Sequence, residues 1–442
     1  MASPSTKSAP IAVRGRVLRF TADPFVAAPA ASYEYLEDGV VVLAGGNIQS
    51  VADASKRLDL PPQTEVHHFR DHLILPGFVD CHAHYPQINV VGSYGEQLID
   101  WLTKYTFPAE SKFSDKSVAS VAANAFLQEE LRNGVTTVSA YCTIHPESVD
   151  AFFEAASARN MLVLGGKVFM NRNAPDTLTE FTDATYADTR ALIKKWHGRG
   201  RNIYTLTPRF APTSTPDELK AVASLWDEFP GLRMQTHLSE TKDEVEWVKG
   251  LFPDARDYLD VYDRFGLVRA GAIFGHCIYL SDVELNRLSE TGAAIAHCPT
   301  SNTFLGSGLF DLFRARKVAG RIKIGLGSDI GGGSSFSMFK TMLAAYEAAQ
   351  LNGATLHPVQ AFYLATQAGA DALELGDRVG NIVPGKDADL TIVGLRATDL
   401  LSLRMDQAKT LDELLFLLMV LGDDRAIAAT IAGGKFAYRR EA

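Results

Sequence analysis

The sequence has few cysteines, no long apolar run and no cluster of basic residues. Its four cysteines (Cys81, Cys142, Cys277 and Cys298) stand singly among 442 residues and form neither a C-x-x-C pair nor a spacing typical of disulfides. Reduced thiols in a cytoplasmic protein, packed as small hydrophobic side chains, are the simplest interpretation. This excludes the disulfide-stapled class of secreted domains.

Two further absences limit the partners. No stretch approaches the ~18 consecutive apolar residues of a membrane span, and the start, MASPSTKSAPIAVRG, lacks the basic region and apolar core of a secretory signal. The net charge is −9 and no Lys/Arg cluster stands out, which argues against nucleic acid as a partner. With 46% hydrophobic and 21% charged residues, the composition is that of a soluble globular protein. We expect a cytoplasmic protein with no nucleic acid and no membrane partner.

The two ends of the sequence differ from its middle. Short alternating segments around glycine turns, such as IAVRGRVLRF and GVVVLAGGNIQSVAD, fill residues 11–74, and β-like pieces of the same kind follow residue 380. These ends predict one small β-sandwich domain composed of residues 1–74 and 380–442. The middle, residues 75–379, is predicted to form the larger domain.

The middle contains eight apolar, β-branched runs with helix-like segments between them. Eight β/α units over this length are typical of a (β/α)₈ TIM-type barrel in the α/β class. A doubly wound sheet would also alternate strands and helices, but a barrel explains why so many runs end in polar residues. The runs are 78–84, 134–141, 161–170, 203–212, 232–240, 270–279, 292–301 and 323–332.

Two histidines end the first run, in LPGFVDCHAHYPQ. Residues i and i+2 of a strand point the same way, so His82 and His84 can bind one ion. His237 lies in the fifth run and Asp329 in the eighth. Three imidazoles and one carboxylate suit a catalytic zinc ion with a position open for water. We predict Zn²⁺ on these four side chains, although iron and manganese can share such ligands.

Two more polar residues are candidates for proton transfer. Glu240 follows His237 by three residues, and a helical turn there would place both on one face. A carboxyl group beside an activated water suits proton shuttling. His276 lies near the end of the sixth run, and we expect it to contact either the metal or the attacking water.

Other histidine patterns in the sequence predict no site. The HHFRDH segment at 67–72 precedes the barrel, and we expect its histidines on the solvated face of the small domain. His145 and Glu147 form an H-x-E of the kind found in the zinc deaminases of nucleobases, but the P-C-x-x-C that should follow is absent. Neither pattern is therefore counted as a metal site.

Several motifs together resemble the amidohydrolase superfamily of metal-dependent hydrolases: PGFVDCHAHYPQ, the H-x-x-E at 237–240, IFGHC, IAHCPTSN and GLGSD. GNIVPGKDADLTIV resembles the segment by which many members re-enter the small β-domain. Two-metal members bridge their ions with a carbamylated lysine on the fourth strand. The fourth run here, YTLTPRFAP, has no lysine, so one ion per subunit is expected. A homodimer is the family expectation.

Within this superfamily, WLTKYTFPAE, TPRFAP and SDIGGGSSFSM are similar to the members that deaminate guanine. The resemblance covers nearly the whole chain and implies zinc-dependent hydrolysis of guanine to xanthine and ammonia in purine catabolism. The metal ligands that it implies are His82, His84, His237 and Asp329. The catalytic residues that it implies are Glu240, His276 and Asp329. The substrate-binding residues that it implies are His84, Gln87, Arg209, Phe210, His237, Glu240 and Asp329.

The chemistry of a purine substrate agrees with these roles. Gln87 offers both a hydrogen-bond donor and an acceptor, and Arg209 can donate to the O6 carbonyl, which distinguishes guanine from adenine. Phe210 can pack against the ring or belong to the core. Ser328 departs from relatives that place threonine before the aspartate, and this change is chemically small.

Two other functions stay open at this point. An aminohydrolase of the same architecture that acts on cytosine, an adenosine derivative or a chlorinated triazine would share the chemistry and differ only in the pocket. Some relatives lost their metal ligands and became non-catalytic assembly proteins. Because each expected ligand and the glutamate are present in this sequence, we favour an enzyme.

Overall fold

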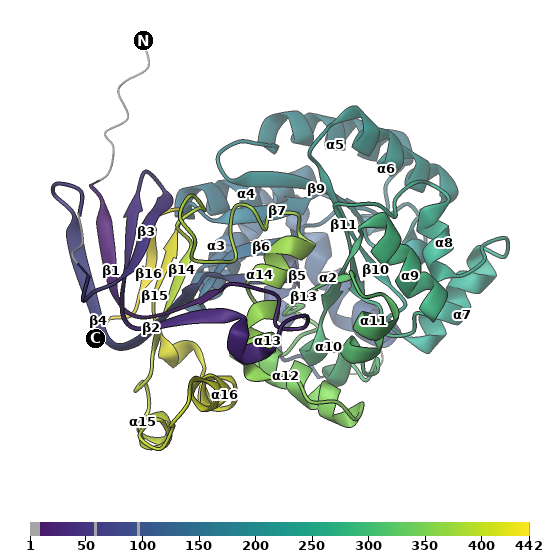
Figure 1. The fold of residues 1–442 in the computed structure, drawn as a ribbon. Helices are drawn as coiled ribbons and strands as arrows, with labels where there is room; N and C mark the ends of the chain where they lie inside the picture. Colours follow the sequence, from purple (N-terminus) through teal and green to yellow (C-terminus); the bar gives the residue numbers. More distant parts are fainter. Residues whose placement is uncertain (1–8, 57–59, 95–97, 442) are drawn as a thin grey trace, which may run out of the picture.

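The centre of the molecule is a barrel of parallel strands, with a second sheet beside it (Figure 1). The structure is a computed structural model that describes residues 9–56, 60–94 and 98–441. The barrel strands are neighbours in chain order, and each overlaps one of the eight predicted runs. The predicted fold class is therefore confirmed. The barrel strands are β5 (Phe78–His84), β6 (Val135–Tyr141), β7 (Leu162–Gly166), β9 (Asn202–Pro208), β10 (Arg233–Leu238), β11 (Ala272–His276), β12 (Ala294–His297) and β13 (Lys323–Leu326), and a short β8 (Val168–Phe169) pairs with β9.

The barrel closes between its first and last strands. The N–H of Asp329 donates to the carbonyl of His82 at 2.8 Å, just beyond the end of β13. The buried carboxylate of Asp80 adds to this closure, because its Oδ1 accepts from the N–H of Ser328 at 2.9 Å and from the N–H of His82 at 3.1 Å. The first and eighth strands are thus fixed together at the end of the barrel that carries their polar residues.

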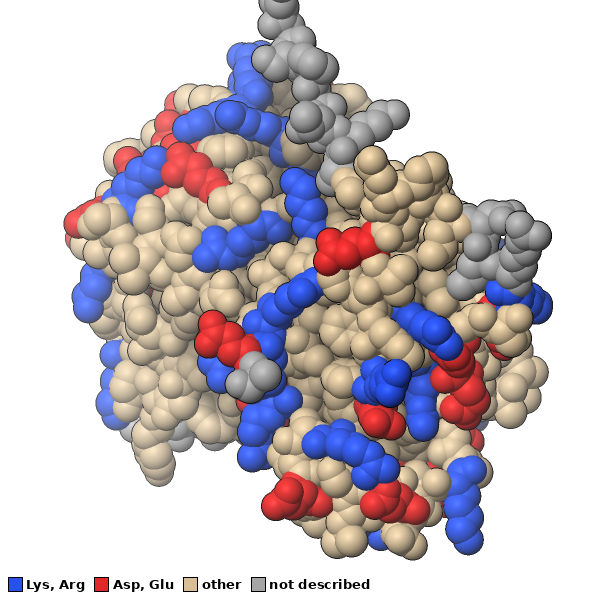
Figure 2. Space-filling model, turned by 90° about the vertical axis from the view of Figure 1, so that its left-hand side faces the viewer, with Lys and Arg blue, Asp and Glu red and all other residues tan. Residues whose placement is uncertain are grey.

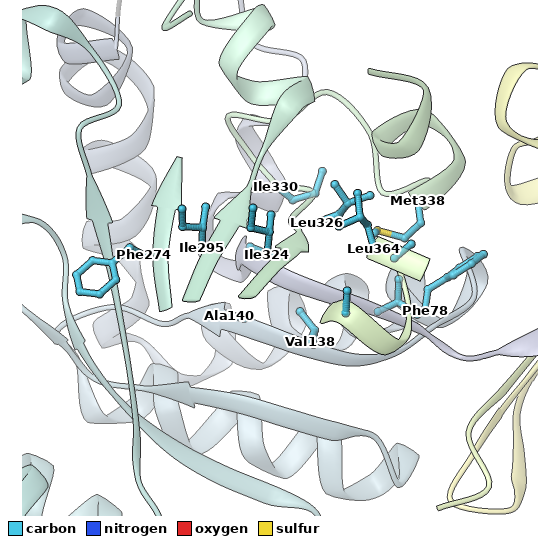
Figure 3. Close-up of a cluster of buried hydrophobic side chains, with 14 of the residues drawn as sticks. Phe78, Val138, Ala140, Phe274, Ile295, Ile324, Leu326, Ile330, Met338 and Leu364 are labelled. Atoms are coloured by element: carbon cyan, nitrogen blue, oxygen red, sulfur yellow. The ribbon is translucent and has the colours of Figure 1, made fainter. Parts of the chain in front are cut away.

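Helices cover the outside of the barrel, and buried apolar side chains fill the layer between helices and strands. Figure 3 shows part of this layer, where Phe78 of β5 and Leu326 of β13 lie near Leu364. Several helices begin at a Ser, Thr or Asp whose side chain accepts a backbone N–H. The helices after β5 are α1 (Leu98–Trp101), α2 (Phe107–Glu110), α3 (Lys116–Arg132), α4 (Pro146–Arg159), α5 (Thr182–Trp196), α6 (Pro216–Glu228), α7 (Lys242–Leu251), α8 (Tyr258–Asp263), α9 (Asp282–Thr291), α10 (Pro299–Phe304), α11 (Leu312–Val318), α12 (Met338–Leu351), α13 (Pro358–Leu364) and α14 (Gln367–Ala372).

The second sheet combines strands from both ends of the chain, as predicted. Its order is β16-β15-β14-β4-β1-β2-β3, so purple and yellow strands lie side by side in Figure 1. Val41 and Ile431, from opposite halves of the sheet, belong to one buried cluster, which indicates that the sheet curls over a core of its own. The domain boundaries at residues 75 and 380 stay predictions. The strands are β1 (Ile11–Phe20), β2 (Tyr33–Ala44), β3 (Asn47–Asp53), β4 (Glu65–Pro76), β14 (Leu390–Gly394), β15 (Ile427–Ala432) and β16 (Lys435–Arg439).

One glycine connects the two sheets. β4 ends at Pro76 and β5 begins at Phe78. A Cβ atom on Gly77 would lie 2.2 Å from Oγ1 of Thr136, far inside van der Waals contact. Only glycine allows this close approach, so Gly77 fixes how β5 enters the barrel and where its last residues end.

The surface beside the small sheet carries charges of both signs, with Lys and Arg interspersed among Asp and Glu (Figure 2). A groove of 610 Å³ on this sheet is lined by five arginines (Arg70, Arg396, Arg425, Arg439 and Arg440). Three of these form ion pairs with aspartates, which offsets much of the positive charge. Two helices, α15 (Asp399–Met405) and α16 (Leu411–Leu421), follow β14. Within the described ranges, the helices are too short or too polar to cross a membrane.

Candidate active site

The predicted metal ligands meet at the mouth of the barrel. His82 and His84 are at the end of β5, His237 lies near the end of β10, and Asp329 follows β13. The side chains of His82, His84 and Asp329 are buried, and His237 is half-buried. The carboxyl ends of parallel barrel strands share one face, so residues far apart in sequence converge there.

A bulge in β5 turns both of its histidines toward the mouth. Cys81 belongs to the cluster inside the barrel, and Phe78 belongs to the cluster outside it. Strict alternation would place His82 outside, with Phe78. The pairing of β5 with β6 shifts register within residues 80–83, and such a bulge re-aims the side chains that follow. The rings of His82 and His84 consequently lie with their centroids 5.2 Å apart.

Ring nitrogens and a carboxylate approach one another closely at this point. Nε2 of His84 lies 3.1 Å from Nε2 of His237. Oδ1 of Asp329 lies 3.4 Å from Nε2 of His82 and 3.5 Å from Nε2 of His84. Burial lowers the pKa of all three histidines, which favours neutral imidazoles with free lone pairs. Neutral imidazoles are the form that binds a metal ion.

The orientations of these rings fit a bound cation. Nδ1 of His237 donates to the carbonyl of Arg209 at 2.6 Å, which leaves the lone pair on Nε2, the atom that faces His84. Nε2 of His82 has no hydrogen-bond partner among the described residues, although it is buried. Buried polar atoms are nearly always partnered, so a cation is the partner that this arrangement of lone pairs suits.

Two further side chains could contribute a ligand. Close groups of metal-binding side chains in the described part of the chain are His82 with His237 and His276, and His82 with Cys298 and Asp329. Cys298 is the weaker ligand, because burial raises the pKa of its thiol well above the usual value and a metal requires the thiolate. His276 lies 3.8 Å from Asp329 through Nε2 and Oδ2, close enough to contact either a metal ion or its water.

Glu240 reaches the same mouth from the segment between β10 and α7. The expected helical turn at 237–240 is wrong, because Ser239 adopts a left-handed conformation with φ 52° and α7 begins only at residue 242. Thr241 and Glu244 form the capping box of α7, and the same Glu244 carboxylate also accepts from the N–H of Glu240 at 2.9 Å. Oε2 of Glu240 then lies 3.4 Å from Nε2 of His276.

Glu240 and His276 form a coupled acid–base pair. Burial raises the pKa of Glu240 to about 7. Burial alone would lower the pKa of His276, but the carboxylates of Glu240 and Asp329 outweigh it and raise this pKa above its usual value. Nδ1 of His276 faces Oδ1 of Asn302 at 2.8 Å, and the hydroxyl of Ser307 donates to Glu240 at 2.9 Å. A carboxyl group with a pKa near 7 can accept and release a proton at neutral pH.

The backbone of the mouth is strained at the same residues. His276, Cys277 and Asp329 have φ values of 68°, 56° and 51°. Residues with a Cβ atom pay about 1–2 kcal/mol each for this left-handed conformation. Such strain clusters at functional sites, where the surrounding structure holds it.

A second buried group lies beside the four predicted metal ligands, which form what we call the metal side of the mouth. Gln87 belongs to a 3₁₀ segment, η2 (Tyr85–Val90), Arg209 follows β9, and Glu110 ends α2. Nε2 of Gln87 donates to Oε1 of Glu110 at 2.8 Å. Nη1 of Arg209 donates to Oε1 and Oε2 of Glu110 at 3.1 and 3.0 Å. Glu110 has no role predicted from the sequence, although it ends the motif WLTKYTFPAE, whereas Asn302 is an alternative to His297 among the polar residues at the strand ends.

Phe210 lies on the metal side of the mouth. Its ring packs edge-to-face on His237 with the centroids 6.5 Å apart, and on Trp247 of α7 with the centroids 6.1 Å apart. The side chain is buried. Phe210 therefore supports the ring of His237.

The other polar patterns of the sequence lie elsewhere. The HHFRDH segment is part of β4 in the small sheet, with the side chain of His68 exposed. His145 precedes α4 as its cap residue. Lys167 is buried after β7, where it pairs with Glu180. The groups of metal-binding side chains in the described ranges all contain His82, so none of these residues belongs to one.

The comparisons with known proteins agree with this geometry. The chain matches the amidohydrolase family over residues 73–437. It is 45% identical over 412 residues to the guanine deaminase of Escherichia coli (strain K12), which covers 93% of each chain. It is 38% identical over 436 residues to a probable guanine deaminase of Deinococcus radiodurans, covering 97% of this chain and 99% of that one.

Solved structures show the same relationship. The structure of E. coli guanine deaminase matches with a TM-score of 0.93 at 44% identity, covering 97% of this chain and 100% of that one. Guanine deaminase from C. acetobutylicum with bound guanine matches with a TM-score of 0.88 at 30% identity and the same coverage. The chain belongs to the amidohydrolase family, whose members are metal-dependent. The resemblance seen in the sequence motifs is thus confirmed.

Proposed function

We propose that this chain is a guanine deaminase, which hydrolyses guanine to xanthine and ammonia. The observation that carries the proposal is that two groups of side chains lie next to each other at one barrel mouth. The first group is three imidazoles with the carboxylate of Asp329, and the second is the buried amide of Gln87 with the guanidinium of Arg209. Arg209 joins them, because its carbonyl accepts from His237 and its side chain donates to Glu110. Two relatives that the chain matches over nearly their whole length, at 45% and 38% identity, are a guanine deaminase and a probable guanine deaminase.

We assign one metal ion to His82, His84, His237 and Asp329. A divalent cation bound there would act as a Lewis acid that lowers the pKa of a water molecule toward neutrality. Three imidazole nitrogens and one carboxylate favour zinc over the harder cations, which prefer oxygen ligands. The three imidazoles, kept neutral by burial, are ready to bind it.

Protons must move because attack at C2 places negative charge on the ring nitrogens and the amine is a poor leaving group. In the proposed reaction, Asp329 receives the proton of the attacking water, and Glu240 delivers a proton to N3. The tetrahedral carbon then collapses and expels ammonia after a second proton transfer. His276, hydrogen-bonded at Nδ1 by Asn302, orients the attacking oxygen through Nε2. The pKa of about 7 for Glu240 supports its role as the shuttle.

Substrate recognition falls to the second group. Gln87 would meet the base with its remaining donor and acceptor, and Arg209 would donate to the O6 carbonyl. His84, His237, Glu240 and Asp329 would surround the reacting carbon, and Phe210 would support the ring of His237. A site that donates to O6 rejects a base with an amino group at that position.

The direct test is xanthine formation from guanine by the purified protein, followed by absorbance. Ammonia release from adenosine and cytosine, and chloride release from a chlorinated triazine, measured alongside, separate this function from other hydrolases of the same architecture. We expect guanine to be turned over with the highest kcat/KM. A higher kcat/KM for another base in this panel would contradict the proposed substrate.

The proposed activity places the chain in purine catabolism. We propose a homodimer in the cytoplasm, with the small domain formed by residues 1–74 and 380–442 and the barrel domain by 75–379. Sedimentation analysis of the purified protein tests the subunit number, and a mass near that of one 442-residue chain would contradict the dimer.

A further inference from the structure

We propose that Glu110 is a positioning residue that sets the purine specificity of this site. It holds Gln87 and Arg209 together so that their remaining polar atoms face the O6 edge of an oxopurine. This inference rests on the proposed function and adds a residue to it. One carboxylate receives hydrogen bonds from both side chains that were assigned to base recognition.

The carboxylate fixes the orientation of the Gln87 amide. An ionised carboxylate only accepts hydrogen bonds, so the amide nitrogen of Gln87 must face Glu110. On the other side, the N–H of Gly331 donates to Oε1 of Gln87 at 3.4 Å. A flipped amide would lose both contacts and set oxygen against oxygen. Gln87 can therefore offer a substrate one remaining N–H and one remaining lone pair, in fixed directions.

The same carboxylate fixes the guanidinium of Arg209. Only Nη1 of its side chain donates within the described part of the chain, so the donors on Nη2 and Nε stay available for a ligand. The ring of Phe107, also in α2, lies 5.7 Å from Cζ of Arg209. Glu110 and Phe107, both in α2, thus hold the guanidinium in place. The atoms of Arg209 that stay free for a ligand are hydrogen-bond donors.

Burial makes the ion pair between Glu110 and Arg209 necessary for both side chains. Glu110 is 1% exposed and Arg209 is 3% exposed. Two charges at such depth are tolerated only as a well-formed pair, because each alone lacks its solvation. Among the described residues, Glu110 is the carboxylate that pairs with the Arg209 side chain. Without it, the buried guanidinium would lose the acceptor that fixes its direction.

The chemical consequence is a preference for a carbonyl at C6. The donors of Arg209 and the donor of Gln87 complement an oxygen acceptor, whereas an amino group would set donor against donor. A purine with only hydrogen at C6 would leave these buried groups unpaired. The expected ligands are oxopurines such as guanine and hypoxanthine.

The test compares Glu110→Gln with the wild-type holoenzyme in binding and in turnover. Hypoxanthine and unsubstituted purine both lack the 2-amino group, so they act as competitive inhibitors, and they differ at the O6 edge. We expect the wild type to bind hypoxanthine more tightly than purine and Glu110→Gln to lose this preference. Guanine kcat/KM should fall by about 100-fold, as for other misplaced binding groups, while metal content stays at one ion per chain.

Two further variants separate positioning from general stability. Glu110→Asp keeps the charge on a shorter side chain, and we expect it to restore part of the preference. In the double variant Glu110→Gln/Arg209→Ala, the loss in kcat/KM should be smaller than the product of the two single losses, because Glu110 acts partly through Arg209 and partly through Gln87. Glu218→Gln is the matched control, since Glu218 is another buried glutamate but lies on α6, outside the mouth.

The outcomes distinguish this inference from the function on which it rests. If the wild type forms no xanthine, the proposed function fails. If the wild type deaminates guanine and Glu110→Gln keeps the inhibitor preference, only the role of Glu110 is overturned. Losses in the double variant that multiply in full would also overturn it, since they would mean that Glu110 does not act through Arg209. For a Glu110→Gln protein that does not fold, Glu110→Asp provides the same comparison, and an unchanged preference there contradicts the proposal.

Discussion

The two sides of the barrel mouth are built from different parts of the chain. The metal side uses residues at the ends of barrel strands, among them His82, His237 and Asp329. The base side uses connecting segments, with Gln87 in η2 and Glu110 in α2. Strand ends are held by the ladder and vary little in position, whereas loops can change their length and sequence. In the proposed function, the strand ends would hold the metal ion, and the connecting segments would recognise the base and, through Glu240, deliver the proton.

Arg209 is the residue that connects these sides. Its carbonyl belongs to the backbone beyond β9 and fixes His237, while its guanidinium belongs to the base side. A change of its side chain should therefore affect selectivity and spare the metal. Changes confined to either side make this division testable.

The largest effect is expected from His82→Ala on the metal side. Loss of one imidazole should abolish stoichiometric zinc, and turnover of guanine should fall by about 10³-fold or more, because a catalytic metal contributes several kcal/mol to transition-state stabilisation. Metal analysis and steady-state kinetics check this result. Full metal retention in His82→Ala would mean that the metal site lies elsewhere.

A smaller loss is expected from Glu240→Gln, which keeps the size of the side chain. The amide cannot shuttle a proton, so kcat should fall by about 10²–10⁴-fold. Zinc content should stay at the wild-type level, because Glu240 is not a proposed ligand. A near-normal kcat would remove Glu240 as the proton shuttle.

On the base side, Arg209→Ala should lower guanine kcat/KM by about 100-fold without loss of zinc, since the carbonyl that holds His237 is retained. Arg70→Ala is the matched control, because Arg70 lines the groove on the small sheet. Kinetics with guanine and metal analysis of both variants check the expectation. Unchanged guanine kinetics would refute the contact of Arg209 with O6, and loss of zinc would contradict the division into two sides.

Glu218 on α6 should affect stability and leave activity unchanged. Burial raises its pKa to about 8, well above the usual value of about 4.5 that the unfolded chain restores. The folded state holds the proton more tightly, so the free energy of unfolding falls as pH rises between these two values. From pH 6 to pH 9 this carboxyl should cost about 1–3 kcal/mol, and Glu218→Gln should remove that part of the slope. Urea unfolding at both pH values measures it, and identical slopes would contradict the shift.

Much of the fold and of the metal side could be predicted from the sequence. Apolar runs with polar ends are a local signal, so the eight strands and the positions of His82, His84, His237, His276 and Asp329 at their ends could be predicted without coordinates. The bulge within residues 80–83 could not be predicted from the sequence, because it depends on how β5 pairs with β6. The helical turn that would have placed His237 and Glu240 on one face does not form, because Ser239 is left-handed and α7 begins only after its capping box.

The role of Glu110 on the base side could not be predicted from the sequence, for a physical reason. Glu110 lies 23 residues from Gln87 and 99 residues from Arg209 in sequence. No periodicity connects such positions, and a glutamate in a short helix is ordinarily a surface residue. Its role follows only from burial and from three hydrogen bonds that exist in the folded chain.

The most direct test of the account is guanine turnover by one protein sample before chelation, after chelation and after zinc is restored. We expect xanthine formation to stop when the metal is removed and to return with one equivalent of zinc per chain. Undiminished xanthine formation by protein that metal analysis shows to be free of divalent ions would contradict it.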